Sequence, residues 1–195
     1  KSGMLRGSRW FVGGKLNFSE NLLLYANSST ILLNQLESNT LKETTGSELY
    51  DLVSNLASSF RSLGIKKGDV VAGVLINSYE AVALMLATTA CGGVWTSCSP
   101  DFGVKGVLDR LTQVSPKFVF YSKGYRYNGR YYDCRENIKS CLDNLEGVKE
   151  SIEISSYGET EKVVPGCLSL ESFKKYYRPE DQQGKKWSLA FEPMD

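Results

Sequence analysis

The residues able to carry out chemistry in this chain are few, and the residue types that are missing exclude several mechanisms. None of the 195 residues is histidine, which excludes a Ser-His-Asp or Cys-His arrangement and any histidine-ligated metal site within this sequence. The phosphate-binding patterns GxxxxGKS/T and GxGxxG do not occur. Ser172 and Lys175 have the spacing of a β-lactamase nucleophile, but none of the accompanying motifs is present. We therefore predict no catalytic residue and no metal site in this sequence.

The cysteines indicate a reducing environment. They are odd in number and include no CxxC spacing, which favours reduced thiols over a disulfide framework or a zinc site. We therefore expect a cytosolic protein. Two of them lie seven residues apart on a predicted helix, where we expect half-buried packing. The five are Cys91, Cys98, Cys134, Cys141 and Cys167.

Composition narrows the class of protein and of partner. Hydrophobic residues make up 42% and charged residues 23%, which is typical of a globular domain. The net charge of +1 leaves no electrostatic footprint for nucleic acid or an anionic membrane. No apolar stretch approaches the roughly 20 residues of a membrane-spanning helix, and Lys1–Gly13 does not read as a signal peptide. We expect a small-molecule substrate, with no nucleic-acid and no membrane partner.

Hydrophobic periodicity predicts alternating helices and strands. Apolar residues recur at helical spacing from Leu49 to Leu63, with N-cap candidates in Thr44–Ser47 and a stop at Gly64. The continuous apolar run Val70–Ile76 is typical of a strand covered on both faces. A helix capped by Asn77-Ser78 follows.

The alternation then continues to residue 154. We predict strands at 94–98, 117–121 and 148–154, with helices after the loop 99–103 and over 135–145. Asn128-Gly129 is a strong β-hairpin signal between them. This pattern predicts an α/β fold, a parallel sheet flanked by helices. Loops 77–78, 99–103 and 122–130 should then share the carboxyl edge of the sheet, where such folds bind ligands.

The two ends of the chain are less regular. Residues 1–40 read as a lead-in segment with a short helix near 19–25, capped by Ser19, and residues 41–195 as the α/β domain. Residues 155–164 read as a loop and 168–177 as a short helix. Trp187 and Phe191 look like the start of an unfinished element, so the sequence reads as interrupted.

Particular stretches resemble the AMP-forming acyl-CoA synthetases of the adenylate-forming superfamily. Leu63–Val71 resembles the segment that leads into their first core strand, and Asn77–Ala81 and Cys91–Trp95 continue the pattern. Three further stretches resemble the acetoacetyl-CoA synthetases within that superfamily. They are Trp10–Asn21, Trp95–Gly103 with the Val107–Leu111 that follows, and Tyr127–Gly129. Val12 departs from the proline usual in the family, and residues 155–178 follow no pattern of the family.

The resemblance implies a two-step reaction. Acetoacetate would attack the α-phosphate of ATP, with Mg²⁺ as the accompanying ion, and the thiol of coenzyme A would then displace AMP. It also implies that this chain is a partial N-terminal adenylation domain that ends before the ATP phosphate loop. We therefore expect the 195-residue chain alone to be inactive as a ligase.

The same resemblance assigns part of the coenzyme A site to this chain. A loop matching Ser99, Pro100, Asp101, Phe102 and Gly103 lines the pantetheine tunnel in related enzymes, and arginines matching Arg126 and Arg130 meet the nucleotide phosphate. Arg126 aligns directly with one of these arginines of the related enzymes, whereas Arg130 aligns with one only after a shift of one residue.

Alternatives remain open for each of these residues. Both arginines could lie at a solvated hairpin tip, Asp101 could cap the following helix, and Trp95 could serve core packing. The substrate could be acetate or propionate, and the protein could be a non-catalytic relative that acts as a binding module.

Overall fold

The protein is described from a computed structural model. It describes residues 12–29, 31–36, 40–155, 163–176 and 190–193. Within these ranges no helix combines the length and apolar character needed to cross a membrane. In chain order, the elements are α1 (Phe18–Leu23), β1 (Ile31–Leu36), β2 (Thr40–Thr45), α2 (Gly46–Ser62), β3 (Val70–Val74), α3 (Tyr79–Ala90), β4 (Val94–Cys98), η1 (Pro100–Phe102), α4 (Gly103–Leu111), β5 (Phe118–Ser122), β6 (Gly124–Tyr127), β7 (Arg130–Asp133), α5 (Arg135–Leu142), β8 (Glu150–Ile154), β9 (Leu168–Ser169) and α6 (Leu170–Tyr176).

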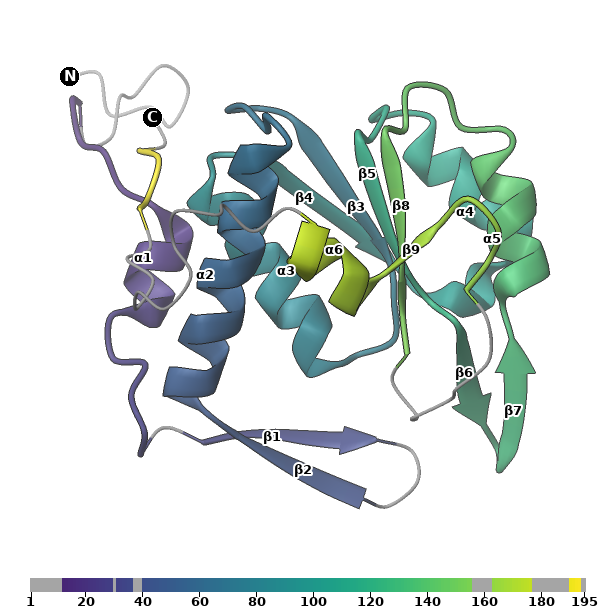
Figure 1. The fold of residues 1–195 in the computed structure, drawn as a ribbon, viewed down its shortest axis with the longest axis horizontal. Coiled ribbons are helices and arrows are strands. Elements are labelled where there is room, and N and C mark those ends of the chain that lie inside the picture. Colours follow the sequence, from purple (N-terminus) through teal and green to yellow (C-terminus); the bar gives the residue numbers. More distant parts are fainter. Residues whose placement is uncertain (1–11, 30, 37–39, 156–162, 177–189, 194–195) are drawn as a thin grey trace, which may run out of the picture.

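A five-stranded parallel sheet organises the fold, which confirms the predicted class (Figure 1). Its order is β4-β3-β5-β8-β9. The chain therefore moves outward from β3 to β4, crosses back to β5, and continues outward to β8. This reversal places a topological switch point between the carboxyl ends of β3 and β5, where open α/β sheets bind ligands.

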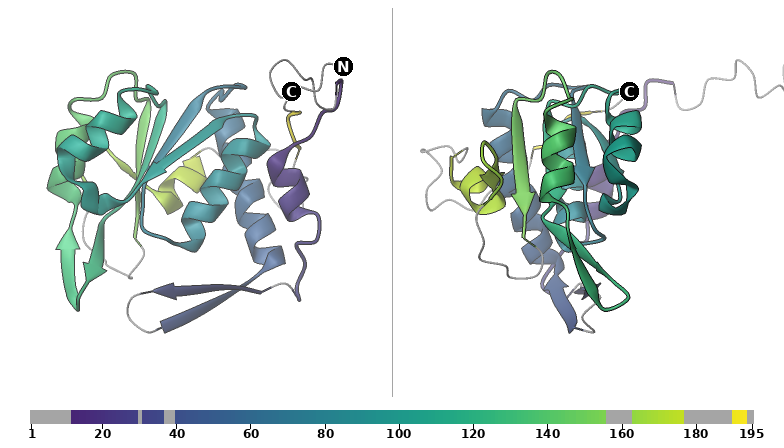
Figure 2. Two further views of the ribbon diagram at one scale, coloured as in Figure 1. Left: turned by 180° about the vertical axis from the view of Figure 1, so that it is seen from behind. Right: turned by 90° about the vertical axis from the view of Figure 1, so that its right-hand side faces the viewer.

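Helices cover both faces of the sheet (Figure 2). On one face, α2, α3 and α6 pack over a core in which the Phe60 ring meets those of Phe118, Phe120 and Phe173 at centroid distances of 5.8 to 6.2 Å. On the other face, α4 and α5 pack over a second core that includes Val107. The buried hydrophobic residues of the sheet therefore divide between two cores, according to the face on which each side chain lies.

The boundaries of α2 follow the predicted chemistry. The Thr45 hydroxyl accepts the N–H of Glu48, and the Glu48 carboxylate accepts the N–H of Thr45, which forms a capping box. Gly64 follows the helix with φ of +73°, the left-handed conformation that glycine adopts at helix ends.

Of two other predicted caps, that of α1 by Ser19 was wrong, and that of α3 by Asn77-Ser78 is confirmed at Ser78. Asn17, and not Ser19, caps α1, because its side chain accepts the N–H groups of Ser19 and Glu20. Ser78, and not Asn77, caps α3 through the N–H of Ala81. Neighbouring Ser and Asn residues have similar capping propensity, so the sequence could not choose between them.

Three strands, β1, β2 and β9, were not predicted. The antiparallel hairpin of β1 and β2 extends away from the sheet (Figure 1), and the boundary expected after residue 40 falls at the first residue of β2. The short strand β9 precedes α6 where one helix was predicted. Trp187 and most of the predicted loop 155–164 lie outside the described residues.

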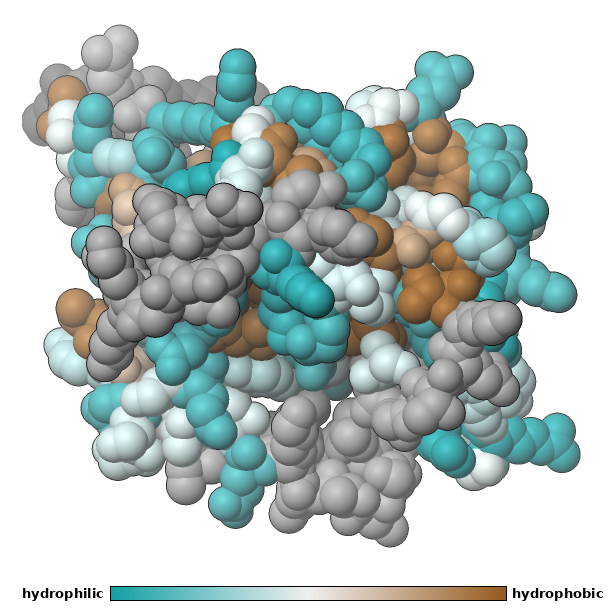
Figure 3. Space-filling view, in the orientation of Figure 1, coloured by the Kyte–Doolittle hydropathy of each residue, from teal (hydrophilic) through white to brown (hydrophobic). Residues whose placement is uncertain are grey.

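The surface facing the viewer in Figure 3 mixes hydrophilic residues with hydrophobic ones. Exposed large hydrophobic side chains are concentrated along the N-terminal segment around α1: Val12, Leu16, Phe18, Leu22, Leu24 and Tyr25.

Candidate functional site

The three predicted loops do meet at the carboxyl edge of the sheet. The N–H of Leu75, just after β3, donates to the carbonyl of Cys98 at 3.1 Å. The N–H of Ile76 donates to the hydroxyl of Ser122, at the end of β5, also at 3.1 Å. These two bonds tie the ends of β4, β3 and β5 together at the switch point.

The sheet nevertheless divides these loops between its two faces. Val71 and Leu75 of the β3 region lie in the core under α2 and α3, whereas Ala72 and Val74 lie in the core under α4 and α5. The same alternation applies to β4, where Trp95 packs with the first core and Cys98 with the second. The edge therefore presents two separate regions, one on each face.

The loop Ser99–Gly103 forms a single 3-10 turn ahead of α4. Pro100 occupies its first turn and is buried, and Gly103 ends it with φ of +65°. The predicted cap by Asp101 is wrong, because neither η1 nor α4 has a side-chain cap. The Arg110 guanidinium lies 4.3 Å from the ring centroid of Phe102 and holds that ring by a cation–π contact. The carboxylate of Asp101 stays exposed.

The predicted hairpin at Asn128-Gly129 is confirmed. Asn128 and Gly129 have φ of 49° and 72°, as a two-residue type I′ turn requires. At the other end of β6, a Cβ on Gly124 would lie 2.5 Å from the Tyr131 hydroxyl, so glycine allows that ring to cross the strand.

The register of the hairpin places the two candidate arginines on opposite faces. Arg126 pairs with Tyr131, whereas Arg130 pairs with Tyr127. Directly opposed residues share a face and neighbours along a strand alternate. The Arg126 guanidinium accordingly lies over the Tyr131 ring, 5.9 Å from its centroid. One face of the hairpin therefore carries Arg126, and the other carries Arg130.

The face with Arg130 is the one that turns toward the loop Ser99–Gly103. Tyr125 and Tyr132 stack on this face, with ring centroids 5.1 Å apart and planes 13° apart. Burial, and then the nearby Cys134 and Asp101, raise the pKa of Tyr125. β6 also lies against η1. Arg130, the stacked tyrosines and the loop therefore belong to one side of the molecule.

Charged residues secure the base of the hairpin. The Asp133 carboxylate accepts hydrogen bonds from the backbone N–H and the guanidinium of Arg135, and these bonds lower the pKa of Asp133. The N–H of Cys134 donates to the carbonyl of Lys123 at 2.9 Å. The hairpin is thereby joined to both β5 and α5, which fixes the direction in which it leaves the sheet.

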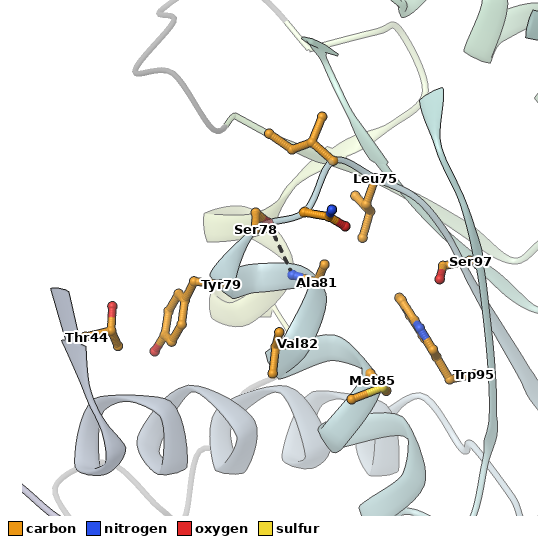
Figure 4. A pocket seen from close by; sticks show the side chains of 11 residues that line it. Thr44, Leu75, Ser78, Tyr79, Ala81, Val82, Met85, Trp95 and Ser97 are labelled. Atoms are coloured by element: carbon orange, nitrogen blue, oxygen red, sulfur yellow. Dashed lines mark hydrogen bonds between the residues drawn. The ribbon is translucent and has the colours of Figure 1, made fainter. Parts of the chain in front are cut away.

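A cavity of about 400 Å³ lies on the opposite face of the same edge, and the sequence did not predict it. Val82 and Met85 from α3 form one wall, and Trp95 and Ser97 from β4 form the other (Figure 4). The Trp95 ring lies over Gly73, where an added Cβ would be 2.7 Å from the ring. A glycine inside an apolar strand signals such a close approach. Trp95 thus both packs on β3 and lines a cavity.

Cys134 and Cys141 are packing residues, as predicted, but both are buried in the second core where half-buried positions were expected. All five cysteines are free thiols, and four of them are buried. Burial raises the pKa of Cys91, Cys134 and Cys141 to about 11, so these thiols stay protonated near neutral pH. In the described part of the chain, no group of three His, Cys, Asp or Glu residues could hold a metal ion.

Comparison with known proteins gives a consistent result. Residues 29–191 match the family described as AMP-binding enzyme. The chain is 37% identical over 192 residues to the acetoacetyl-CoA synthetase of Danio rerio, covering 95% of this chain and 28% of that protein. It is 42% identical over 138 residues to the acetoacetyl-coenzyme A synthetase of Rhizobium meliloti (strain 1021), covering 71% of this chain and 21% of that protein.

Comparison with solved structures agrees with the sequence matches. The solved acetoacetyl-CoA synthetase from Streptomyces lividans superposes with a TM-score of 0.85 and 35% identity, over 97% of this chain and 28% of that one. An acyl-CoA synthetase from Brucella canis matches with a TM-score of 0.68 and 20% identity, over 92% of this chain and 29% of that one, which shows the fold alone. The chain thus spans 21 to 29% of the length of these relatives.

Proposed function

The chain belongs to the AMP-binding enzyme family, and on that basis we propose that it is part of an acetoacetate–CoA ligase. In this reaction the acetoacetate carboxylate attacks the α-phosphate of ATP and releases diphosphate. The thiol of coenzyme A then attacks the acyl carbon of acetoacetyl-AMP and releases AMP. The products are acetoacetyl-CoA, AMP and diphosphate.

The match to the Streptomyces lividans acetoacetyl-CoA synthetase is the observation that supports this substrate. It covers nearly the whole chain at 35% identity and a TM-score of 0.85. The relatives from Danio rerio and Rhizobium meliloti carry the same name at 37% and 42% identity. Acetate and propionate, the alternative substrates, have no comparable support among these relatives.

The part of the reaction proposed for this chain is recognition of coenzyme A. Arg130 offers a guanidinium on the hairpin face nearest the loop Ser99–Gly103, and arginine suits phosphate because it donates two parallel hydrogen bonds. The exposed Phe102 ring and the stacked pair Tyr125 and Tyr132 lie on the same side. We propose that the nucleotide phosphate meets Arg130 and that the pantetheine arm passes the loop.

No catalytic step is assigned to residues of this chain. Its contribution is to bind and orient coenzyme A at the carboxyl edge, where the bonds of Leu75 and Ile76 hold the loops in place. Among the described residues, no cluster of three His, Cys, Asp or Glu side chains could hold the Mg²⁺ that is expected with ATP. A cytosolic location stays a prediction from the cysteine usage.

The test compares acids in the longer polypeptide that carries this chain. Exchange of labelled diphosphate into ATP reports the first half-reaction, and thioester formation reports the second. We expect both with acetoacetate, at a kcat/KM well above that for acetate or propionate. Preference for acetate or propionate would refute the substrate, and no exchange with any of the three acids would favour the non-catalytic alternative. The 195-residue chain alone is expected to show neither half-reaction.

A further inference from the structure

The side chain of Asn17 joins three segments that are distant in the sequence. Its Oδ1 accepts the N–H groups of Ser19 and Glu20, at 2.9 and 3.3 Å, at the start of α1. Its Nδ2 donates to the carbonyl oxygens of Thr89 and Glu192, at 2.8 and 2.7 Å. Asn17 is 1% exposed. The amide therefore uses both of its N–H donors and accepts two bonds, the full capacity of an asparagine side chain.

The partner segment, Ala190–Pro193, crosses the end of α3. The N–H of Glu192 donates to the carbonyl of Ala90 at 2.9 Å, and a Cβ on Gly92 would lie 3.2 Å from the Cβ of Glu192. Phe191 packs against the core under α2 and α3. We call residues Ala190–Pro193 the strap (yellow in Figure 1, close to α1). It passes the turn that leads into β4, at the amino edge of the sheet.

The last carbonyl groups of a helix have no partner within the helix. At the end of α3, the carbonyl of Ala90 is bonded by Glu192 of the strap, and that of Thr89 by the side chain of Asn17. The direct bond from Asn17 to the Glu192 carbonyl closes this arrangement. The N–H groups of Gly92 and Gly93 bond to the carbonyls of Thr89 and Thr88 within the turn that ends α3. The remaining bonds at this end come from two segments 175 residues apart in the chain.

α1 has an attachment to α3 that does not involve the strap. The hydroxyl of Ser19 donates to the carbonyl of Leu86 at 2.7 Å and bonds to the hydroxyl of Thr89. The helix would therefore remain docked if the strap were released. This separation makes the capping role and the bridging role of Asn17 distinguishable by experiment.

We propose that Asn17 is a positioning residue for the strap: its two N–H donors fix where the chain passes the start of β4. Loss of these donors loosens the strap at Glu192, while α1 stays capped and the sheet stays folded. The strap is then held by the bond from the Glu192 N–H to Ala90, by the packing of Phe191 and by the bond from the Arg61 guanidinium to the Ala190 carbonyl.

The test uses Asn17→Ser and Asn17→Asp in the 195-residue chain. Both replacements retain an oxygen that can cap a helix, but neither has the pair of N–H donors with which the Asn17 amide bonds to Thr89 and Glu192. The serine variant is neutral. The aspartate variant places a negative charge beside the negative end of α3 and the positive end of α1. Asn27→Ser is the matched control, because Asn27 is exposed and its side chain bonds to Tyr25 and Ser29 nearby.

The readout is hydrogen exchange of individual amides by NMR. In both Asn17 variants we expect the Glu192 amide to exchange about three- to tenfold faster, as the loss of a hydrogen bond predicts. The amides of Ser19 and Glu20 should change by less than about twofold, since the cap is retained. The amides of β5 report global unfolding and should be unchanged. In Asn27→Ser the amides of Ser19, Glu20, Glu192 and β5 should all be unchanged, and any change should be confined to the neighbourhood of Ser29.

Two results would overturn the proposal. An unchanged Glu192 amide in Asn17→Ser would mean that other contacts hold the strap. Equal acceleration of the Glu192, Ser19 and β5 amides in Asn17→Ser would mean that Asn17 contributes only to global stability.

Discussion

Replacing Arg130 by alanine tests the proposed coenzyme A contact most directly. Arg130 is exposed on the hairpin face that turns toward the loop Ser99–Gly103. A charge-assisted contact to phosphate at such an exposed position is worth about 1–2 kcal/mol, which corresponds to a KM for coenzyme A raised about 5–30-fold. Because this contact binds the ground state and the transition state alike, kcat should change little.

The assay separates the two half-reactions of the longer enzyme. Diphosphate exchange uses no coenzyme A and should stay at the parental rate in Arg130→Ala. Arg126→Ala is the matched control, because Arg126 lies on the opposite face of the same hairpin. We expect its KM for coenzyme A to rise by less than about threefold. Added salt should weaken coenzyme A binding in the parent and affect Arg130→Ala less.

Three outcomes would refute this reasoning. If both half-reactions fall together in Arg130→Ala, the side chain is structural. If neither changes, Arg130 is an ordinary solvated arginine at a hairpin tip. If Arg126→Ala raises the KM and Arg130→Ala does not, the phosphate binds on the other face of the hairpin.

Three further predictions concern the scaffold. Gly73→Ala should lower the free energy of unfolding by about 1–3 kcal/mol, because its Cβ would lie 2.7 Å from the Trp95 ring. Urea unfolding measures this, and adding Trp95→Leu should recover part of the loss; an unchanged midpoint in the single variant would contradict the close approach. Thr45→Ala should cost about 1 kcal/mol through loss of the capping box, and Thr45→Ser much less; equal losses in both would argue against the cap. Burial alone would raise the pKa of Asp69, but hydrogen bonds from the Lys117 ammonium and the Lys66 N–H hold it below 3.8. The folded-state pKa is thus depressed, so this carboxylate stabilises the fold above pH 3.8 and the contribution is lost as the pH falls through the lowered value. Asp69→Asn should therefore flatten the acid limb of a stability–pH curve, and an identical limb in the variant would show that the pair contributes nothing.

Much of the sheet could be predicted because its signals are local. The apolar run from Val70 and the helical spacing from Leu49 to Leu63 indicate a buried strand and an amphipathic helix. The turn at Asn128-Gly129 requires left-handed backbone, which these residues adopt readily. The first and last residues of β4, and the end of α2 at Gly64, were also predicted, because these signals too are local in the sequence.

The candidate site could be predicted only in part. The alternation of strands and helices predicted a parallel sheet with loops 77–78, 99–103 and 122–130 at its carboxyl edge. The structure confirms that placement. The division of that edge into two faces could not be read from the sequence. Each helix that connects two strands packs on one face of the sheet or on the other. That choice divides the side chains of β3 and β4 between the two cores, and so divides the edge into two faces.

Sequence by itself determined the class of fold and the family resemblance, and the candidate residues for coenzyme A stay a prediction from that resemblance. The two-residue turn at Asn128-Gly129 fixes the hairpin register and so sets Arg126 and Arg130 on opposite faces. Tertiary structure alone decided that the hairpin lies against η1, because only the packing of the core brings these segments together. It also decided that Asn17 bonds to Thr89 and Glu192. No local pattern encodes a hydrogen bond across 175 residues, since its partners become neighbours only when the core brings α1, α3 and the strap together.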